Sequence, residues 1–245
     1  MKKLFAAILA LCMMMTACAF AEGTLTMGTN AHFPPYEYYE DNQVIGIDAE
    51  IAAAIAAKLG MDLEIVDTDF DTLVPSVAAG KYDFAMAGMT VTEERLQSVS
   101  FSVTYATGVQ SIIVKEDSPI TGVDDLYAEG AAYVVGVQQG TTGDIYCSDD
   151  FGAERVMQYK TGNDAVAALV AGKVDCVIID NNPAKAYVDA NEGLKILDTE
   201  YVEEEYAIAI NQTNTELLEK VNAALEELIA DGTVDAIIAK YIPVE

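Results

Sequence analysis

The chain has 245 residues, and its 13 Lys and Arg against 40 Asp and Glu give a formal net charge of −27 at pH 7. Such an acidic chain argues against nucleic acid and anionic lipid as partners, since both are bound through patches of Lys and Arg. The length suffices for one large domain or for two smaller lobes, each with a buried core.

Residues 1–21 are predicted to be a signal peptide rather than part of the fold. Lys2 and Lys3 precede an apolar run that is too short for a comfortable membrane span, as in a secretory signal. Two kinds of processing stay open: cleavage after Ala21, or a lipobox that leaves a lipidated Cys18. We therefore expect an extracytoplasmic protein, in the periplasm or at the cell surface, that is either released or lipid-anchored.

The first part of the folded chain predicts alternating strands and helices. Pro34 and Pro35 exclude a helix directly after the first strand. Asp48 is the predicted N-cap of the first helix, and Gly60 is its predicted stop. The predicted strands cover residues 24–30, 44–47 and 61–66, and the predicted helices cover 47–59 and the segment that opens at 69–71.

Two segments, residues 73–95 and 165–181, share one pattern of an apolar helix, Ala-Gly-Lys, one further residue, an Asp and an apolar strand. Aligning the two glycines of this pattern places Gly88 on Asp180. A repeat of this length indicates two similar α/β units. Ligands of open parallel sheets collect beyond the carboxyl ends of the strands, so we expect Gly88, Thr90 and Asp180 to face one crevice.

Two long extended stretches predict crossings between the lobes. Residues 99–114 are too long for one ordinary strand and place a hinge at 105–108, and residues 201–211 place a second hinge at 204–207. The first lobe is therefore discontinuous. The predicted domains are residues 22–106 with 206–245 for lobe 1, and residues 107–205 for lobe 2.

The second lobe predicts a strand over residues 133–137 that leads into a glycine-containing loop at 138–143. A strand, a glycine turn and a helix start form a natural cradle for an anion or a polar ligand, although neither nucleotide-binding glycine motif is present.

Cys147 and Cys176 leave two possibilities open, a disulfide or two small buried side chains. The remaining elements are a strand at 155–159, a helix from 215 that Asp231-Gly232 stops, and a last helix capped by Thr233.

Five segments in order resemble a known family: residues 28–60, 87–102, 136–144, 178–181 and 228–241. The chain resembles the extracytoplasmic amino-acid-binding proteins of ABC importers, solute-binding protein family 3, of the polar amino-acid type. The resemblance covers essentially everything after the leader. It implies an α/β, two-lobe periplasmic-binding-protein-like fold (type II) with two hinge strands. It further implies a monomer without cofactor or metal, whose partners are a free amino acid and a membrane permease.

The resemblance also implies site residues. Arg95 matches the arginine that grips the ligand carboxylate, Gly88 and Thr90 match positions that hold the carboxylate and the ammonium, and Asp180 matches the ammonium-binding aspartate. Asn30 stands where relatives often carry Asp, and this loss of charge weakens the case for a purely cationic ligand. No spare Lys or Arg lies in these loops, which argues against an acidic ligand. We therefore expect a polar neutral or a basic amino acid. The other predicted pocket residues are Phe33, Phe70, Gln138, Thr141 and Thr142.

Each of these assignments has an alternative. Arg95 could form a surface ion pair with a neighbouring Glu, Asp180 could cap the next helix, and Phe70 could be core. Thr90 to Glu93 further reads as a capping box. For the whole chain, the alternatives are a cleft enzyme of the same fold, similar to cyclohexadienyl or arogenate dehydratases, with His32, Glu37 or Asp180 as acid or base, and a ligand-sensing module. We expect no enzyme, because no catalytic triad or metal-ligand arrangement can be assembled.

Overall fold

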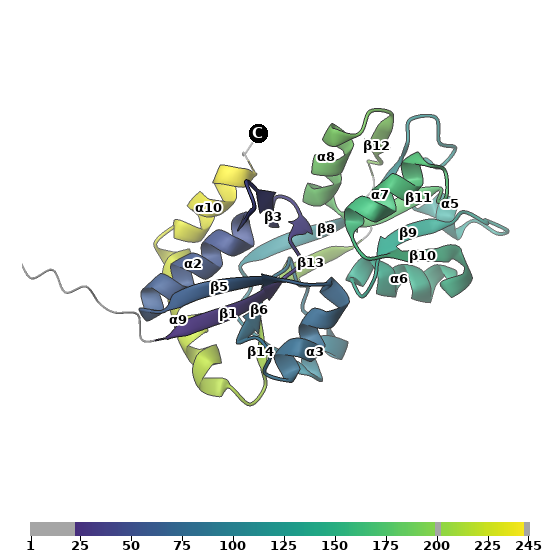
Figure 1. Cartoon of the computed structure of the whole chain (residues 1–245). Coiled ribbons are helices and arrows are strands. Elements are labelled where there is room, and N and C mark those ends of the chain that lie inside the picture. Colours follow the sequence, from purple (N-terminus) through teal and green to yellow (C-terminus); the bar gives the residue numbers. More distant parts are fainter. Residues whose placement is uncertain (1–22, 199–201, 243–245) are drawn as a thin grey trace, which may run out of the picture.

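The structure is a computed structural model that describes residues 23–198 and 202–242. The predicted signal peptide and Cys18 lie outside these residues. Figure 1 shows two lobes, each built on its own sheet, with strands β8 and β13 passing between them. The two-lobe α/β fold predicted from the sequence is confirmed.

The first lobe is organised around a five-stranded sheet in the order β5-β1-β6-β14-β7. β1 runs parallel to β5 and β6, whereas β14 is antiparallel to β6 and β7. The strands are β1 (Thr24–Thr29), β5 (Asp62–Asp67), β6 (Phe84–Ala85), β7 (Val99–Phe101) and β14 (Ala209–Asn211). A separate meander contains β2 (His32–Phe33), β3 (Glu37–Glu40) and β4 (Gln43–Ile45). The helices are α2 (Ile47–Leu59), α3 (Leu73–Ala78), α4 (Glu93–Leu96), α9 (Thr215–Ala230) and α10 (Thr233–Tyr241).

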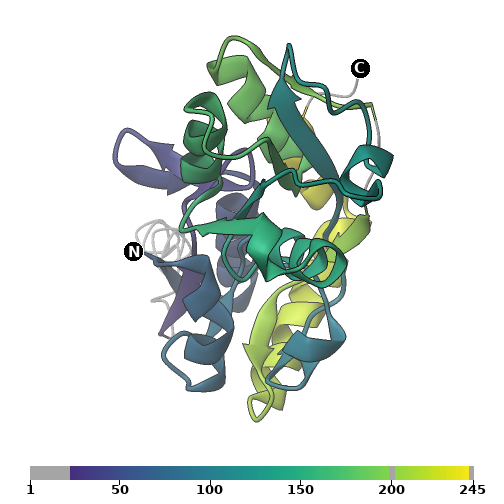
Figure 2. The same ribbon diagram turned by 90° about the vertical axis from the view of Figure 1, so that its right-hand side faces the viewer.

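The second lobe has the sheet order β10-β9-β11-β8-β12, in which β8 is antiparallel to β11 and β12. Its strands are β8 (Ala106–Lys115), β9 (Val135–Gln138), β10 (Val156–Tyr159), β11 (Cys176–Asp180) and β12 (Leu194–Ile196). Its helices are α5 (Asp124–Tyr127), α6 (Thr142–Phe151), α7 (Gly162–Val170) and α8 (Asn181–Ala190). Viewed from the side of this lobe, its strands and helices lie in front of the first lobe (Figure 2).

Two antiparallel strands form the connection between the lobes. β13 (Glu203–Tyr206) pairs with the first half of β8, with Tyr206 opposite Ala106 and Glu203 opposite Val109. Both strands lie where the sequence predicts crossings. The exact boundaries of the two lobes stay a prediction.

The internal repeat folds in the same way in both lobes. Gly80 and Gly172 follow α3 and α7 with positive φ angles of 72° and 70°. In each case the glycine N–H and the next N–H bond back to carbonyls of the last helical turn, at Val77 and Ser76 in lobe 1 and at Leu169 and Ala168 in lobe 2. This is the left-handed helix ending that glycine permits. The chain then turns into β6 and β11, whose carboxyl ends reach the same region.

The cores follow the predicted apolar stripes. Ile47, Ile51 and Ile55 of α2 are buried in one cluster with Val221 and Leu225 of α9. In lobe 2, the two described cysteines, Cys147 and Cys176, are buried in the core as free thiols. Burial raises the pKa of the Cys176 thiol to about 12, which keeps it protonated and unreactive.

Candidate functional site

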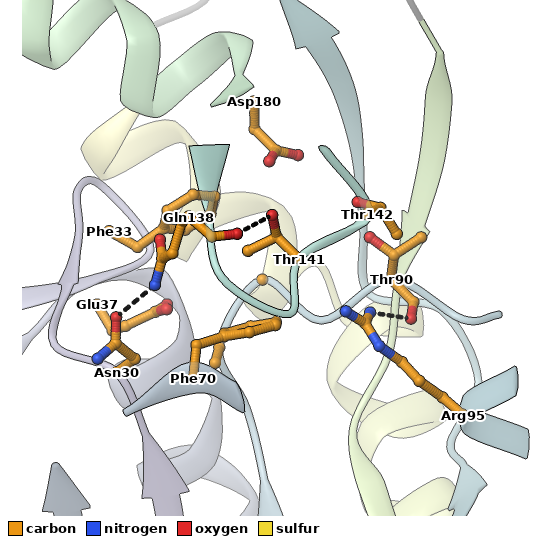
Figure 3. Close-up of a pocket in the computed structure, with 12 residues that line it drawn as sticks. Asn30, Phe33, Glu37, Phe70, Thr90, Arg95, Gln138, Thr141, Thr142 and Asp180 are labelled. Atoms are coloured by element: carbon orange, nitrogen blue, oxygen red, sulfur yellow. Dashed lines mark hydrogen bonds between the residues drawn. The ribbon is translucent and has the colours of Figure 1, made fainter. Parts of the chain in front are cut away.

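A narrow cavity lies between the two lobes, beyond the ends of β6, β9 and β11. All of the binding residues predicted from the sequence line it, together with Glu37 and Ala87 (Figure 3). The predicted residues in the lining are Asn30, Phe33, Phe70, Gly88, Thr90 and Arg95 from lobe 1, and Gln138, Thr141, Thr142 and Asp180 from lobe 2.

Arg95 is buried, with 7% of its surface exposed, so the surface ion pair considered as an alternative is wrong. Its Nη1 donates to the carbonyl of Thr90 at 2.6 Å, and its Nη2 donates to the carbonyl of Gly140 in the other lobe at 3.1 Å. The guanidinium lies 5.4 Å from the ring centre of Phe70. Burial lowers the pKa of Arg95, but a guanidinium remains charged near neutral pH. Arg95 thus places a fixed positive charge at the cavity.

The capping box predicted from Thr90 to Glu93 is wrong. Thr92 caps α4, because its side chain accepts a hydrogen bond from the backbone N–H of Arg95 at 3.1 Å. The hydroxyl of Thr90 instead donates to Glu204 of β13 at 3.0 Å. Thr90 therefore faces the hinge strand and the cavity, not the helix.

Gly88 is held in a backbone conformation that favours glycine, with φ of 51°. A Cβ at this position would lie 2.7 Å from Cε1 of Phe33, so a side chain would displace the ring that lines the cavity. The N–H of Gly88 donates to Asp48 at 2.9 Å, and the hydroxyl of Tyr105 donates to the same carboxylate oxygen at 2.9 Å. The prediction that Asp48 caps α2 is therefore wrong. The N-cap is Gly46, and Asp48 is a buried residue that holds the Gly88 turn.

Asp180 ends β11, and each of its carboxyl oxygens accepts one hydrogen bond from a neighbouring side chain. Its carboxyl accepts a short hydrogen bond from the hydroxyl of Tyr206 and a 2.8 Å bond from Nε2 of Gln110. It stands at the N-cap position of α8 but makes no side-chain cap bond, so the alternative of a mere helix cap is wrong. Burial, with the nearby charge of Glu204, raises the pKa of Asp180 to about 8. A cation placed beside it would favour its charged form.

Glu37 is the cavity residue that the sequence did not single out as a ligand contact. Its side chain comes from β3, is 0% exposed and lines the cavity beside Asn30 (Figure 3). Neither carboxyl oxygen accepts a hydrogen bond from a donor group among the described residues, but Glu37 makes a side-chain hydrogen bond with the carboxyl of Asp48, as a protonated Glu37 can. Burial, reinforced by Asp48, raises the pKa of Glu37 well above its usual value. Ionising a carboxyl buried beside another acid is costly unless a cation reaches it.

The loop after β9 contributes the other wall. The hydroxyl of Thr141 donates to the carbonyl of Gln138 at 2.8 Å. The same hydroxyl accepts from the N–H of Asp144, so that Thr141 is the N-cap of α6. Thr142 is the first residue of α6 and is buried. The N-terminus of α6 therefore opens onto the cavity, as the predicted cradle requires.

The lobes touch each other around the cavity, so the structure is a closed arrangement. Nε2 of Gln138 donates to Oδ1 of Asn30 at 2.9 Å, across the gap between the lobes (Figure 3). At the rim, Lys160 of lobe 2 lies 3.0 Å from Asp69 and 3.2 Å from Asp71 of lobe 1. Residues that line one cavity thus come together only when the lobes meet.

Of the three residues considered as a cleft acid or base, Glu37 and Asp180 line the cavity and His32 does not. His32, the only histidine, is exposed and does not line the cavity, so it is not placed as a cleft acid or base. Over residues 23–198 and 202–242, no group of three or more His, Cys, Asp or Glu side chains could hold a metal ion. What the cavity does offer is one guanidinium and two carboxyls, a set that suits a small molecule carrying both signs of charge.

Comparison with known proteins agrees with this arrangement. The model of the bacterial extracellular solute-binding proteins, family 3, matches residues 25–244. The chain is 32% identical over 260 residues to the arginine-binding extracellular protein ArtP of Bacillus subtilis (strain 168), with 98% of each chain covered. Two solved structures of an ancestral arginine-binding protein are also similar, each at 40% identity over 91% of this chain and 99% of that chain. The one bound to arginine has a TM-score of 0.83 and the one bound to glutamine a TM-score of 0.85.

Proposed function

The chain belongs to the bacterial extracellular solute-binding proteins, family 3, and we propose that it captures a basic amino acid, arginine above all, for the permease of an ABC importer. The guanidinium of Arg95 would bind the ligand carboxylate and Asp180 the ligand ammonium. Because Arg95 and Asp180 come from different lobes, a zwitterion between them would stabilise the closed form over the open one. That closed form is the signal that a permease can recognise.

The observation that carries the choice of a basic ligand is the buried carboxyl of Glu37, which lies beside the acids Asp48, Asp180 and Asp67. A neutral amino acid would satisfy Arg95 and Asp180 and leave Glu37 buried without a charged partner. A ligand with a cationic side chain would give Glu37 that partner and neutralise the acidic excess of the cavity. The similarity to arginine-binding relatives supports the same choice.

Glu37→Gln is expected to change selectivity rather than abolish binding. A hydrogen bond to a charged group contributes about 1.5–3 kcal/mol, so arginine affinity should fall roughly 10- to 100-fold. Glutamine affinity should change less than about threefold, since glutamine brings no cation to Glu37. Isothermal titration calorimetry with arginine, lysine, histidine, glutamine and cystine would measure both effects on the wild type and the variant.

Glu40→Gln is the matched control, because Glu40 ends the same strand β3 and its side chain is exposed. It removes one negative charge from the same strand and should leave every affinity unchanged. The proposal fails if the wild type binds no amino acid, or if arginine and glutamine lose the same affinity in Glu37→Gln.

The proposal extends to the protein's assembly, location and processing. We expect a monomer without enzymatic activity that works outside the cytoplasm, released or anchored through Cys18. Over the part of the chain that the structure describes, no helix is long and apolar enough to cross a membrane. Mass spectrometry of the mature protein would distinguish a cleaved N-terminus at Glu22 from a lipidated Cys18.

A further inference from the structure

Glu204 lies behind the cavity on the hinge strand β13, where neighbouring side chains alternate between solvent and interior. Glu203 and Glu205 are exposed, whereas Glu204 is 4% exposed. Its Oε2 accepts from the hydroxyl of Thr90 at 3.0 Å and from Nε2 of Gln110 at 3.1 Å. Its Oε1 is buried and has no hydrogen-bond partner within the described residues. Glu204 thus orients a cavity residue of lobe 1 and a strand residue of lobe 2 from the connection between them.

Gln110 brings a second carboxyl to the same point. The nitrogen that donates to Glu204 also donates to Oδ2 of Asp180 at 2.8 Å. An amide carries no net charge and cannot neutralise two carboxylates. The guanidinium of Arg95 gives its hydrogen bonds to the carbonyls of Thr90 and Gly140, not to either carboxyl. The carboxyls of Asp180 and Glu204 therefore share the amide of Gln110 and receive no hydrogen bond from Arg95.

The other ionisable groups around this pair do not supply that cation. Arg95 is the only positive charge among them, and the remaining groups are acids and phenols. They are Glu37 of β3, Tyr36 before it, Arg95 of α4, Tyr146 of α6 and Tyr206 of β13. In such surroundings, burial and the neighbouring Glu204 favour the protonated form of Asp180.

We infer that Glu204 is a positioning residue of the binding site that makes capture of an amino acid release a proton. The inference rests on the proposed function, because it needs an ammonium group to arrive at Asp180. Without a ligand, the carboxyl of Asp180 keeps a proton because it is buried beside Glu204. When the ligand ammonium binds Asp180, its positive charge takes the place of that proton, which passes to the solvent.

The pKa of Asp180 agrees in direction with this linkage. Burial and Glu204 raise it to about 8 in the empty site, so Asp180 is largely protonated below that pH. A bound ammonium lowers the pKa, and one proton is lost per ligand between the two values. Affinity then rises with pH by up to about tenfold per unit until about pH 8, where Asp180 is already ionised.

The test is calorimetric titration with L-arginine at pH 6.5 in two buffers of different ionisation enthalpy, which counts the protons released. Glu204→Gln keeps an oxygen that can accept from Thr90 and Gln110 but removes the charge that holds the proton. We expect the wild type to release more protons than Glu204→Gln, by up to one per ligand, and the slope of log affinity against pH to be correspondingly steeper, because burial still raises the pKa of Asp180 in the variant. Protons released at Glu37 contribute equally to both proteins and cancel. Glu205→Gln, an exposed change on the same strand, should match the wild type.

A ligand-free measurement decides the inference even if the proposed function is wrong. Because the folded pKa of Asp180 lies above the unfolded value of 3.8, its stabilising contribution is fully present below about pH 4 and is lost as pH rises to about 8. Thermal unfolding from pH 5 to 8 should therefore show a steeper loss of stability in the wild type than in Glu204→Gln.

If arginine binds with equal proton release in both proteins, the inference is wrong. If no amino acid binds, the proposed function fails, and parallel stability curves would overturn the inference separately.

Discussion

Arg95→Ala is expected to abolish measurable amino-acid binding. Arg95 is the cation of the cavity, and its loss leaves the ligand carboxylate buried without a charged partner. Removing one member of a buried charge pair costs about 2–5 kcal/mol, roughly a 30- to 5,000-fold loss of affinity. The variant also loses the bond to the carbonyl of Gly140, which joins the two lobes. Calorimetric titration and the ligand-induced shift in melting temperature would measure the loss.

Two further variants identify the cause of that loss. Arg95→Lys keeps the charge but not the planar fork, so we expect an intermediate affinity. Glu93→Ala changes an exposed charge on the same short helix and should bind as the wild type does. Wild-type affinity in Arg95→Ala, with the fold intact by circular dichroism, would contradict the assignment of Arg95.

Asp180→Asn is expected to have opposite effects on binding and on stability. Asparagine can still accept from Tyr206 and Gln110, but it offers the ligand ammonium no negative charge. Affinity should fall by about 2–5 kcal/mol. The ligand-free protein should become more stable, because the variant no longer has to keep a buried carboxyl protonated against its natural tendency to ionise.

The stability gain of Asp180→Asn has a defined pH dependence. The folded pKa of about 8 exceeds the unfolded value of 3.8, so the wild type loses stability as pH rises between these values. The gain should be near zero below pH 4 and should grow by up to about 1.4 kcal/mol per pH unit to about pH 8. Chemical unfolding at several pH values would show it. A variant that loses stability at pH 8 would contradict the raised pKa of Asp180.

Much of the fold follows from local patterns in the sequence. The repeat around Gly80 and Gly172 marks two helix endings of the same geometry, since both need a residue that tolerates positive φ. The stripe of Leu217, Val221 and Leu225 predicts the buried face of α9 because helical periodicity depends only on spacing. These features depend on neighbours in the chain, and for that reason they could be predicted.

The polar partners inside the site could not be predicted in the same way. Asp48 stands beside a helix start and reads as a cap, yet it bonds to Gly88, which lies 40 residues away. Glu37 lies in an aromatic loop that looks exposed in sequence, and only the packing of the meander against the cavity buries it. Such partners depend on how the lobes fold and close, which local spacing does not contain. The resemblance to a family located the pocket, but the structure was needed to show that the carboxyl of Glu37 lines it beside Asp48.

The most direct test of the central claim is a crystal structure of the protein with L-arginine. We predict a closed form with the ligand carboxylate on the guanidinium of Arg95, its ammonium on Asp180 and its side-chain guanidinium on Glu37. A ligand bound outside this cavity, or one whose carboxylate and ammonium reach neither Arg95 nor Asp180, would contradict the account.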